Sequence, residues 1–368
     1  MAEKIWKVAV VGCGSFANGQ YFPNISKEAD AVCVAAADVV FERAEAACRR
    51  YGIPKAYHDV YELLENCDFD IAIDAASIQA HHEINMALLS AGKHLISQKP
   101  AAPDVERLSL QIETAKKNKV NFVCAPIHPM RYDLSLARQW MAAGAIGEVY
   151  YAKCNMSHGG PEYFQYRDAD PSWFFEPGAG ALVDMDVHGL QIVTTLFGPA
   201  KRVGCMAKVT TPRRTVRSGA FDGLEIPADK IPDQYLITLD FGEGKMALVD
   251  SGFSEKASKA PQLEIFGTKG TISFTKPYMQ NPVPEVYLDS PELGIRGWME
   301  PMPGAKPPEK LLSQCCCLRD LIRSIETGLP PRLSPEHARH VLEIMCAIPS
   351  AAEEGRLVEL HTVFERPY

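Results

Sequence analysis

The sequence predicts an α/β fold that begins with a doubly wound parallel sheet, and two observations lead to this prediction. Residues 8–11 (VAVV) form an apolar run that ends at Gly12, Gly14 and Ala17, as in a buried parallel strand that breaks into a tight turn and then a helix. Stretches of helical composition alternate with four further apolar runs, at residues 31–38, 70–77, 94–97 and 120–125. Repeated strand–helix–strand units of this length imply parallel strands joined by right-handed crossovers.

The helices of this first part are predicted between the strands. Helical composition runs over residues 41–51 and stops at Gly52 and Pro54, which break helices. Two more helices are predicted over 60–65 and 82–90. A fourth begins after Pro103, and its apolar side chains share one face: Val105, Leu108, Ile112 and Ala115.

The architecture changes after about Ile127. Strand-like stretches then follow one another closely, at 201–210, 234–241, 245–253 and 262–266. The Pro- and Gly-rich segments 211–232 and 276–310 are long enough to be substrate or interface loops. Two amphipathic helices are predicted over 312–326 and 335–347. We therefore predict two domains, residues 1–127 and 128–368, with an α/β second domain.

Composition limits the partners and the compartment. The chain of 368 residues is long enough for two cores, and its net charge of −8 without a basic run argues against nucleic acid and anionic membranes. We find no stretch as long as a membrane span and no signal-peptide pattern. Eleven cysteines without a CxxC pair suggest a reducing interior, so a cytoplasmic location is expected. The consecutive Cys315, Cys316 and Cys317 are expected to pack in a core or an interface.

The glycine turn and the acid after the second strand predict a dinucleotide site. Gly12 would allow the sharp turn, Gly14 would let the backbone approach a pyrophosphate, and Ala17 would let the helix pack closely on the strand. Asp38 follows about 20 residues later, where an acid accepts the ribose hydroxyls and repels a 2′-phosphate. The cofactor predicted is therefore NAD. The alternative is an ordinary strand-to-helix turn and an aspartate that starts a turn.

Several spaced motifs carry a family resemblance over nearly the whole chain. They are GCGSFA at 12–17, SIQAHH at 77–82, AGKHLISQKP at 91–100, GAIGEVYYA at 144–152, GAGALVDMDVHGLQ at 178–191, EIFGTKGTI at 264–272 and SAAEEGRLVEL at 350–360. Together they resemble the glucose-fructose oxidoreductase, inositol dehydrogenase and rhizopine-catabolism family (Gfo/Idh/MocA). The resemblance implies a Rossmann NAD-binding domain followed by an α/β domain. The large, open, mainly antiparallel sheet of that domain would form a homo-oligomer face.

Gln98, Lys99 and Pro100 resemble the Glu-Lys-Pro of that family, whose lysine contacts the substrate hydroxyl. A lysine at a strand end beside a cofactor crevice can hydrogen-bond an alcohol and stabilise negative charge as its proton leaves. The change from Glu to Gln98 alters the field on Lys99. Without the resemblance, a Lys-Pro after a strand is more often a solvated turn.

Asp184 and His188 lie four residues apart on a predicted helix, about 40° apart around its axis, and Gln191 shares their face. By resemblance His188 is the general base, Lys99 assists it or shares that role, and Asp184 binds a neighbouring hydroxyl or orients His188. Gln191 stands where the family often has Asp, which affects sugar specificity. Asp186 stands where the family often has Gly and points the other way, as a helix-packing or interface feature.

The motifs, the aromatic run and the resemblance together give two sets of candidate ligand-binding residues. The cofactor-binding set is Gly12, Gly14, Ser15, Phe16, Ala17, Asp38, Ser77, Gln79, His82, Gln98 and Lys99. The substrate-binding set is Lys99, His128, Arg131, Tyr166, Trp173, Asp184, His188 and Gln191. For His128 and Arg131 a domain-hinge role is equally consistent, and the aromatic run over 163–175 is either a stacking wall for a sugar or aglycone or part of the core.

No metal site is expected. His81, His82, Asp184 and His188 are ligand types, but two adjacent histidines have poor geometry for one ion. The dinucleotide context already explains a histidine at 82 near the nicotinamide ribose.

The sequence therefore predicts an NAD-dependent oxidoreductase that acts on a secondary hydroxyl of a sugar, polyol or glycoside, with a lean toward the C3 hydroxyl of an O- or C-glucoside. One alternative is an NAD-dependent glycosidase that works by transient oxidation and elimination. Another is a sugar- and NAD-sensing regulator without catalysis. Net NADH formation would indicate the dehydrogenase, and aglycone release without net NADH would indicate the glycosidase. Binding of sugar and NAD without turnover would indicate the regulator.

Overall fold

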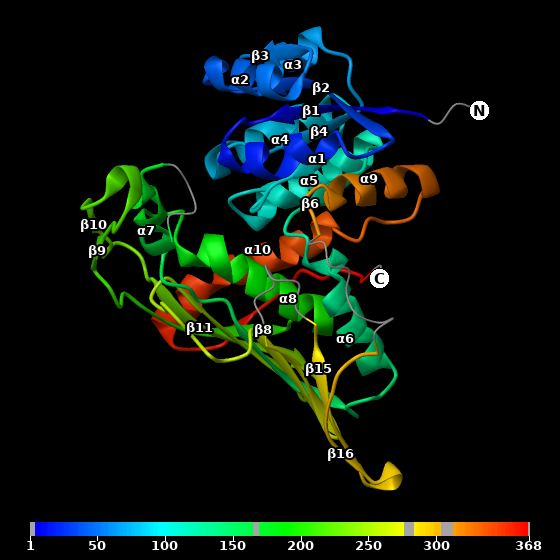
Figure 1. Ribbon diagram of the computed structural model, residues 1–368, viewed down its shortest axis with the longest axis vertical. Coiled ribbons are helices and arrows are strands. Elements are labelled where there is room, and N and C mark those ends of the chain that lie inside the picture. The colour runs from blue at the N-terminus through cyan, green and yellow to red at the C-terminus, as the bar shows by residue number, and fades with distance from the viewer. Residues whose placement is uncertain (1–3, 165–168, 276–282, 303–311, 367–368) are drawn as a thin grey trace. The chain divides into compact units, whose positions relative to one another are not determined.

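The computed structural model describes residues 4–164, 169–275, 283–302 and 312–366 (Figure 1). By its internal contacts the chain divides into two compact units. The first contains the residues up to 127 together with 312–342, and the second contains 128–311 together with 343–366. By these contacts the segment 312–342 groups with the first unit, and the domains 1–127 and 128–368 stay a prediction. Each unit is described by itself.

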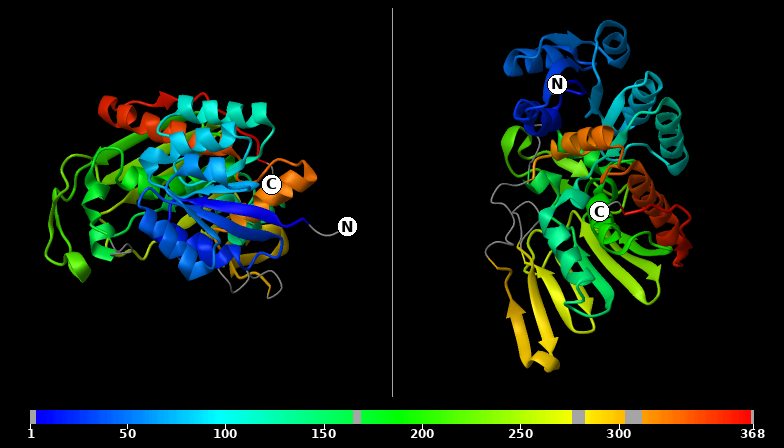
Figure 2. Two further views of the ribbon diagram at one scale, coloured as in Figure 1. Left: turned by 90° about the horizontal axis from the view of Figure 1, so that it is seen from above. Right: turned by 90° about the vertical axis from the view of Figure 1, so that its right-hand side faces the viewer.

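The first unit is built on a six-stranded sheet in the order β3-β2-β1-β4-β5-β6, and all neighbouring strands are parallel. This confirms the predicted doubly wound sheet. The strands are β1 (Trp6–Val11), β2 (Ala31–Ala37), β3 (Lys55–Tyr57), β4 (Ile71–Asp74), β5 (His94–Ser97) and β6 (Phe122–Cys124). Val8, Ala9 and Val10 are fully buried, because helices cover both faces of a parallel sheet of this kind (Figure 2).

The helices of the first unit follow the predicted order. They are a π-helical turn η1 (Ala17–Tyr21), α1 (Phe22–Ile25), α2 (Phe41–Tyr51), α3 (Val60–Asn66), the 3₁₀ turn η2 (Ile78–Ala80), α4 (His81–Ser90), α5 (Val105–Asn118) and α9 (Cys316–Thr327). The last helix, α10 (Pro335–Glu354), begins in this unit and ends in the second. Asp59 and Asp104 cap α3 and α5 through their side chains. Gly52, with φ +69°, ends α2 as predicted.

The second unit is built on a nine-stranded sheet in the order β16-β15-β14-β13-β7-β12-β11-β8-β17. Strands β7 and β12 pair in parallel, and the other neighbours are antiparallel, which confirms the predicted mainly antiparallel sheet. The strands are β7 (Val149–Asn155), β8 (Arg202–Lys208), β11 (Gln234–Gly242), β12 (Lys245–Gly252), β13 (Leu263–Gly267), β14 (Gly270–Phe274), β15 (Glu285–Ser290), β16 (Ile295–Met299) and β17 (Val358–Glu359).

The sheet of the second unit has a buried face and an exposed face. Along β11 the side chains alternate between buried Tyr235 and Ile237 and exposed Leu236. The helical elements of the unit are η3 (His128–Met130), α6 (Tyr132–Ala142), α7 (Pro161–Phe164), η4 (Pro171–Phe175), the π-helical turn η5 (Leu182–Asp186) and α8 (Val187–Phe197). Helix α8 contacts β7 and β12 on the buried face.

The two segments predicted as long loops contain strands. In 211–232, β9 (Arg213–Thr215) and β10 (Glu225–Pro227) form a small antiparallel sheet around the 3₁₀ turn η6 (Gly219–Phe221). Its anchor is Arg214, which is buried and donates to Glu162 at 2.7 Å and to Asp233 at 2.6 Å. In 276–310 the described residues hold β15, the 3₁₀ turn η8 (Pro291–Leu293) and β16.

Within the described ranges, no helix combines the length and the apolar character that a membrane crossing requires.

Candidate active site

In the first unit, the predicted cofactor residues lie at the carboxyl ends of the central strands. The strand order reverses between β1 and β4, and ligands of open α/β sheets bind in the crevice at such a switch point. Gly12 follows β1 with φ +90°, and a Cβ there would lie 2.5 Å from the backbone nitrogen of Ala76 after β4. A side chain at this position would therefore force the backbone after β4 to shift. A Cβ on Gly14 would meet nothing within 4 Å, so the backbone is open to a ligand where the pyrophosphate is expected.

Asp38 follows β2 at the same edge and is joined to the glycine turn. Its Oδ2 accepts the N–H of Cys13 at 2.7 Å, and its Oδ1 accepts the N–H of Val40 at 2.8 Å. These bonds fix the direction of a carboxylate that is 8% exposed. A carboxylate has about four lone-pair sites, so both oxygens retain capacity for ribose hydroxyls. The acid and the glycine cradle together fit a dinucleotide.

The last residue of β4 and the first residue of α4 form a buried polar contact that the sequence did not indicate. Asp74 and His81 are almost completely inaccessible, and their Oδ2 and Nδ1 atoms lie 2.7 Å apart. Oδ1 of Asp74 accepts the N–H of Ala76 at 3.0 Å, which holds the backbone that faces Gly12. Ser77 and Gln79 of the predicted cofactor set are exposed at the start of the following turn. His82 is half-buried and contacts Gln111 at 3.1 Å.

Gln98 and Lys99 follow β5 at the same edge. Gln98 is 8% exposed, and its amide donates to the hydroxyl of the fully buried Tyr21. Burial holds the pKa of Tyr21 well above its usual range, so its hydroxyl stays neutral beside the amide. Lys99 is half-buried. Where the family places a carboxylate, this chain therefore has a neutral amide bound to a neutral phenol.

In the second unit, the residues predicted on one helix face belong to a helix that is widened at its start. Residues 182–186 form a π-helical turn, and α8 continues from Val187. Such turns are rare and frequently lie at functional sites. Asp184 is in the π-helical turn and His188 in the first turn of α8, and both are half-buried. Gln191 is 2% exposed, and its Oε1 accepts the backbone N–H of His128 at 3.3 Å.

His188 contacts a second histidine. Nε2 of His128 lies 2.9 Å from Nδ1 of His188, and the two rings meet edge to face. Nη1 of Arg131 lies 3.3 Å from Nδ1 of His128. The same guanidinium makes a two-point ion pair with Asp133, and both partners are buried. The structure therefore joins three predicted substrate residues to one another and adds Asp133, which the sequence did not indicate.

His158 is a further residue of the second unit that the sequence did not indicate, and it lies near Asp184. It follows β7, its Nδ1 accepts the N–H of Gly160 at 2.9 Å, and its ring stacks on Phe253. Burial lowers the pKa of His158, and the Asp184 carboxylate acts in the opposite direction. The available signal was a histidine before two glycines in SHGGPEYF at 157–164.

The aromatic run divides between core and surface. Phe174 and Phe175 are each 2% exposed and pack against Phe253, as in a core. Trp173 is half-buried and stacks on Phe174 with ring centroids 3.8 Å apart. Phe164 is 51% exposed. Tyr166 lies outside the described residues.

Asp186 lies in the same π-helical turn as Asp184. It is completely buried against the sheet, and neither of its carboxyl oxygens has a hydrogen-bond partner among the described residues. Burial raises the pKa of Asp186 to about 8, with Asp250 acting in the same direction and the nearby Ser251 hydroxyl against it. The three consecutive cysteines are also buried, in agreement with packing. In the part of the chain that the structure describes, no three acidic, histidine or cysteine side chains form a metal-binding group.

Two family models match the chain and together cover more than two thirds of it. Residues 6–125 match "Oxidoreductase family, NAD-binding Rossmann fold", and residues 134–273 match "GFO/IDH/MocA C-terminal domain". The chain belongs to the Gfo/Idh/MocA family. It is thus an NAD(P)-dependent oxidoreductase of the sugar and polyol dehydrogenase family.

Similar proteins include sugar and polyol dehydrogenases. The myo-inositol 2-dehydrogenase of Thermotoga maritima is 22% identical over 97% of this chain and 99% of its own length. The D-glucoside 3-dehydrogenase of Escherichia coli is 24% identical over 69% of this chain and 72% of its own length. The levoglucosan dehydrogenase of Pseudarthrobacter phenanthrenivorans is 27% identical over 63% of this chain, and the match spans 62% of that protein.

A solved structure of a levoglucosan dehydrogenase in complex with NADH and levoglucosan has the same fold. Its TM-score is 0.80, with 21% identity over 97% of this chain and all of that one.

Proposed function

We propose that this family member is an NAD-dependent dehydrogenase acting on a secondary hydroxyl of a sugar, polyol or glycoside. The observation that supports it most is the edge of the first sheet, where the glycine cradle and the carboxylate of Asp38 converge at the topological switch point. The preference for NAD over NADP follows from Asp38, because a 2′-phosphate would face a carboxylate that is already oriented toward the turn.

Lys99, Asp184 and His188 are the proposed catalytic residues. NAD supplies the hydride acceptor when it is bound. The protein must then orient the carbinol and provide a route for its hydroxyl proton. Lys99 and His188 are the two groups of this set that have a proton-accepting nitrogen. In this proposal Asp184 accepts a hydrogen bond from a neighbouring hydroxyl or favours the charged form of a nearby ring.

The first substrates to test are glucosides with a free C3 hydroxyl. The half-buried Trp173 and the exposed Phe164 belong to the same unit as His188, and flat aromatic faces suit a sugar ring or an aglycone. A relative that acts as a D-glucoside 3-dehydrogenase agrees with this choice. Inositols are the second class, because another relative is a myo-inositol 2-dehydrogenase.

A spectrophotometric screen tests the proposal. Purified protein is incubated with NAD or NADP and with inositols, free hexoses, O-glucosides or C-glucosides, and NADH absorbance is followed. We expect NADH formation with at least one of these classes. Aglycone release without net NADH would identify a glycosidase that recycles its cofactor, and binding of NAD and sugar without either product would identify a sensor.

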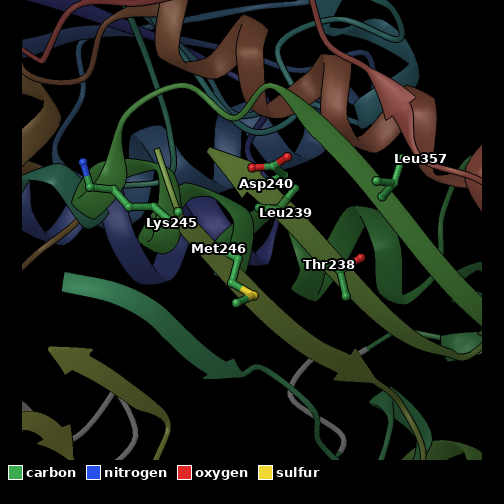
Figure 3. Close-up of a pocket in the computed structure, with 7 residues that line it drawn as sticks. Thr238, Leu239, Asp240, Lys245, Met246 and Leu357 are labelled. Carbon is green, nitrogen blue, oxygen red and sulfur yellow. The ribbon is translucent and has the colours of Figure 1, made fainter. Parts of the chain in front are cut away.

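We also propose that the protein forms a homo-oligomer through the exposed face of its nine-stranded sheet. Met206, Leu236 and Met246 are 62%, 41% and 54% exposed there, which is unusual for large apolar side chains on three adjacent strands. A shallow cavity lies at Thr238, Met246 and Leu357 on the same face (Figure 3), where an apolar side chain of a second copy would fit.

A further inference from the structure

A buried polar cluster in the first unit lies beside the segment that carries Lys99. Its members are Asn85 on α4, Ser97 at the end of β5 and Gln111 on α5, and all three are completely inaccessible to solvent. The Nδ2 of Asn85 donates to the Oγ of Ser97 at 2.9 Å and to the carbonyl oxygen of Ala101 at 3.1 Å. The same nitrogen lies 3.4 Å from the Oε1 of Gln111.

The cluster holds peptide groups on both sides of Lys99. After this residue, the carbonyl oxygen of Ala101 accepts hydrogen bonds from both amides of the cluster, at 3.1 Å and 2.9 Å. Before it, the Oγ of Ser97 donates to the carbonyl oxygen of Gln98 at 3.1 Å. The segment follows β5 at the carboxyl edge of the parallel sheet, where ligands of open α/β sheets bind. Side chains from two helices and a strand therefore fix the backbone at this edge.

The carbonyl group of Ala101 determines the orientation of both amides. A backbone carbonyl accepts hydrogen bonds and never donates, so the NH₂ group of each amide must face it. With the opposite orientation of Gln111, its oxygen would lie against that carbonyl oxygen and its nitrogen against the NH₂ group of Asn85. The nitrogen of Gln111 consequently also faces His82, whose Nδ1 lies 3.1 Å away.

This contact determines the tautomer of His82. An amide nitrogen donates and does not accept, so the Nδ1 of His82 is an acceptor without a proton. A neutral imidazole then carries its proton on Nε2. Burial lowers the pKa of His82, Arg107 acts in the same direction and Asp104 acts against it, which favours the neutral ring. Among the residues that the structure describes, Gln111 is the only hydrogen-bond partner of this ring.

The cluster has a cost for the core of the first unit. The Oδ1 of Asn85 is buried and has no hydrogen-bond partner among the described residues, so it loses its hydration without compensation. Apolar side chains of similar shape would avoid this cost. What the polar groups supply in return is direction, because they orient the carbonyl groups around Lys99 and the ring of His82.

We propose that this buried polar cluster positions the cofactor-binding edge of the first unit, and that it presents His82 to bound NAD as a hydrogen-bond donor through Nε2–H. Its three members are positioning residues. The inference rests on the proposed dehydrogenase function, in which this edge holds the cofactor. Helix α4 begins shortly after β4, and the segment with Lys99 follows β5, so both lie at the ends of neighbouring strands. The acceptor is an oxygen atom of the cofactor, because the ring offers a neutral N–H donor.

Nitrogen-15 NMR of the histidine side chains tests the tautomer without cofactor or substrate. The full chain has ten histidines, and the signals of His82 are those missing from the spectrum of His82→Phe. At pH 7 we expect a proton on Nε2 and none on Nδ1, and addition of NAD should shift the Nε2 signal. A proton on Nδ1, with or without one on Nε2, would overturn the proposal. An unshifted signal in protein that calorimetry shows to be saturated with NAD would overturn the donor role.

Exchange of the Gln111 nitrogen tests the positioning role. In Gln111→Glu an oxygen takes the place of Nε2, so we expect the proton of His82 to move to Nδ1 and the pKa of His82 to rise. In Gln111→Met neither a donor nor an acceptor remains, and we expect both tautomers. Gln139→Glu, at an exposed position on α6, is the matched control and should keep the parent spectrum. The parent spectrum in both Gln111 variants would refute the positioning role.

Removal of the Asn85 amide tests what the cluster does during turnover. Asn85→Leu keeps a side chain of similar size and removes the unpaired oxygen, so its thermal unfolding midpoint should stay close to that of the parent. We expect kcat for NADH formation to fall by roughly tenfold, because a small displacement of a reacting group slows the chemical step. Asn66→Leu, at the exposed end of α3, is the control and should keep the parent kcat.

Two results with Asn85→Leu would contradict a role in turnover. One is an unchanged kcat, and the other is a loss of kcat that matches an equal loss of folded protein. Absence of NADH formation by the parent would instead count against the proposed function. The tautomer of His82 would still decide the positioning role in that case, because the NMR measurement needs no turnover.

Discussion

The buried carboxyl of Asp186 makes a quantitative prediction about stability. It is completely buried, lacks a hydrogen-bond partner among the described residues, and has a pKa raised to about 8 by burial, against an ordinary value of 3.8. Between these two values the folded chain holds a proton that the unfolded chain releases. The free energy of unfolding therefore falls as pH rises, by about 1.4 kcal/mol per pH unit for this group.

Asp186→Asn removes this dependence because an amide does not titrate. From pH 5 to pH 7 we expect the stability of the variant to rise relative to the parent by about 3 kcal/mol. The difference should level off above about pH 8, where the folded parent has also lost its proton. The parent is the reference at each pH, so the other titrating groups of the chain cancel.

Urea unfolding followed by tryptophan fluorescence at half-unit pH steps measures the effect. Asp222→Asn, in the exposed turn after η6, is the matched control and should give a curve parallel to that of the parent. A difference between Asp186→Asn and the parent that stays constant from pH 5 to pH 8 would show that the carboxyl titrates normally and that its burial has no electrostatic cost.

Three further predictions follow from the site and from the exposed sheet face. Gly12→Ala should destabilise the fold by roughly 1–3 kcal/mol, because the residue has a positive φ and lies against the backbone after β4. Gly14→Ala should leave the stability within about 0.5 kcal/mol but weaken NAD binding. Thermal unfolding measures the first effect and titration with the cofactor measures the second. Asp38→Ser should narrow the gap between NAD and NADP in kcat/KM by roughly tenfold, and an unchanged ratio would place the ribose contact elsewhere. Met246→Glu should lower the oligomer mass measured by light scattering, and Leu110→Glu, at an exposed leucine on α5, should not.

The strands that sequence patterns predict best are those whose burial is uniform. The run 8–11 is apolar throughout because helices cover both faces of the first sheet, and this pattern needs no long-range information. Strand β3 (Lys55–Tyr57) escaped prediction because it has three residues at the sheet edge and one buried side chain, Tyr57. The small sheet of β9 and β10 escaped for a different reason. Its stability depends on Arg214, whose partners Glu162 and Asp233 are 52 and 19 residues away in the sequence.

The candidate site was predictable where its residues are neighbours in the sequence. The spacing of Asp184 and His188 placed them on one helix face, and the structure has them in successive helical turns. The contact between His128 and His188 spans 60 residues, and no periodicity reports such a contact. The same holds for Asp74 and His81, because a sequence shows two titratable residues seven positions apart but does not show that both are buried.

The apolar composition of α8 holds its polar residues in fixed positions. Nine of its eleven residues are buried, so packing against the sheet fixes the rotation of the helix about its axis. The direction of the half-buried His188 is thereby set by apolar contacts that no ligand needs to supply, and the hydrogen bond to His128 sets its ring orientation. In the proposed reaction, His188 held in this way would need little reorganisation when substrate binds. The buried carboxyl of Asp186 directly precedes α8, and because its pKa is raised to about 8, its contribution to the free energy of unfolding falls as pH rises between the two pKa values. The Asn variant should therefore keep α8 in place with a stability that depends less on pH.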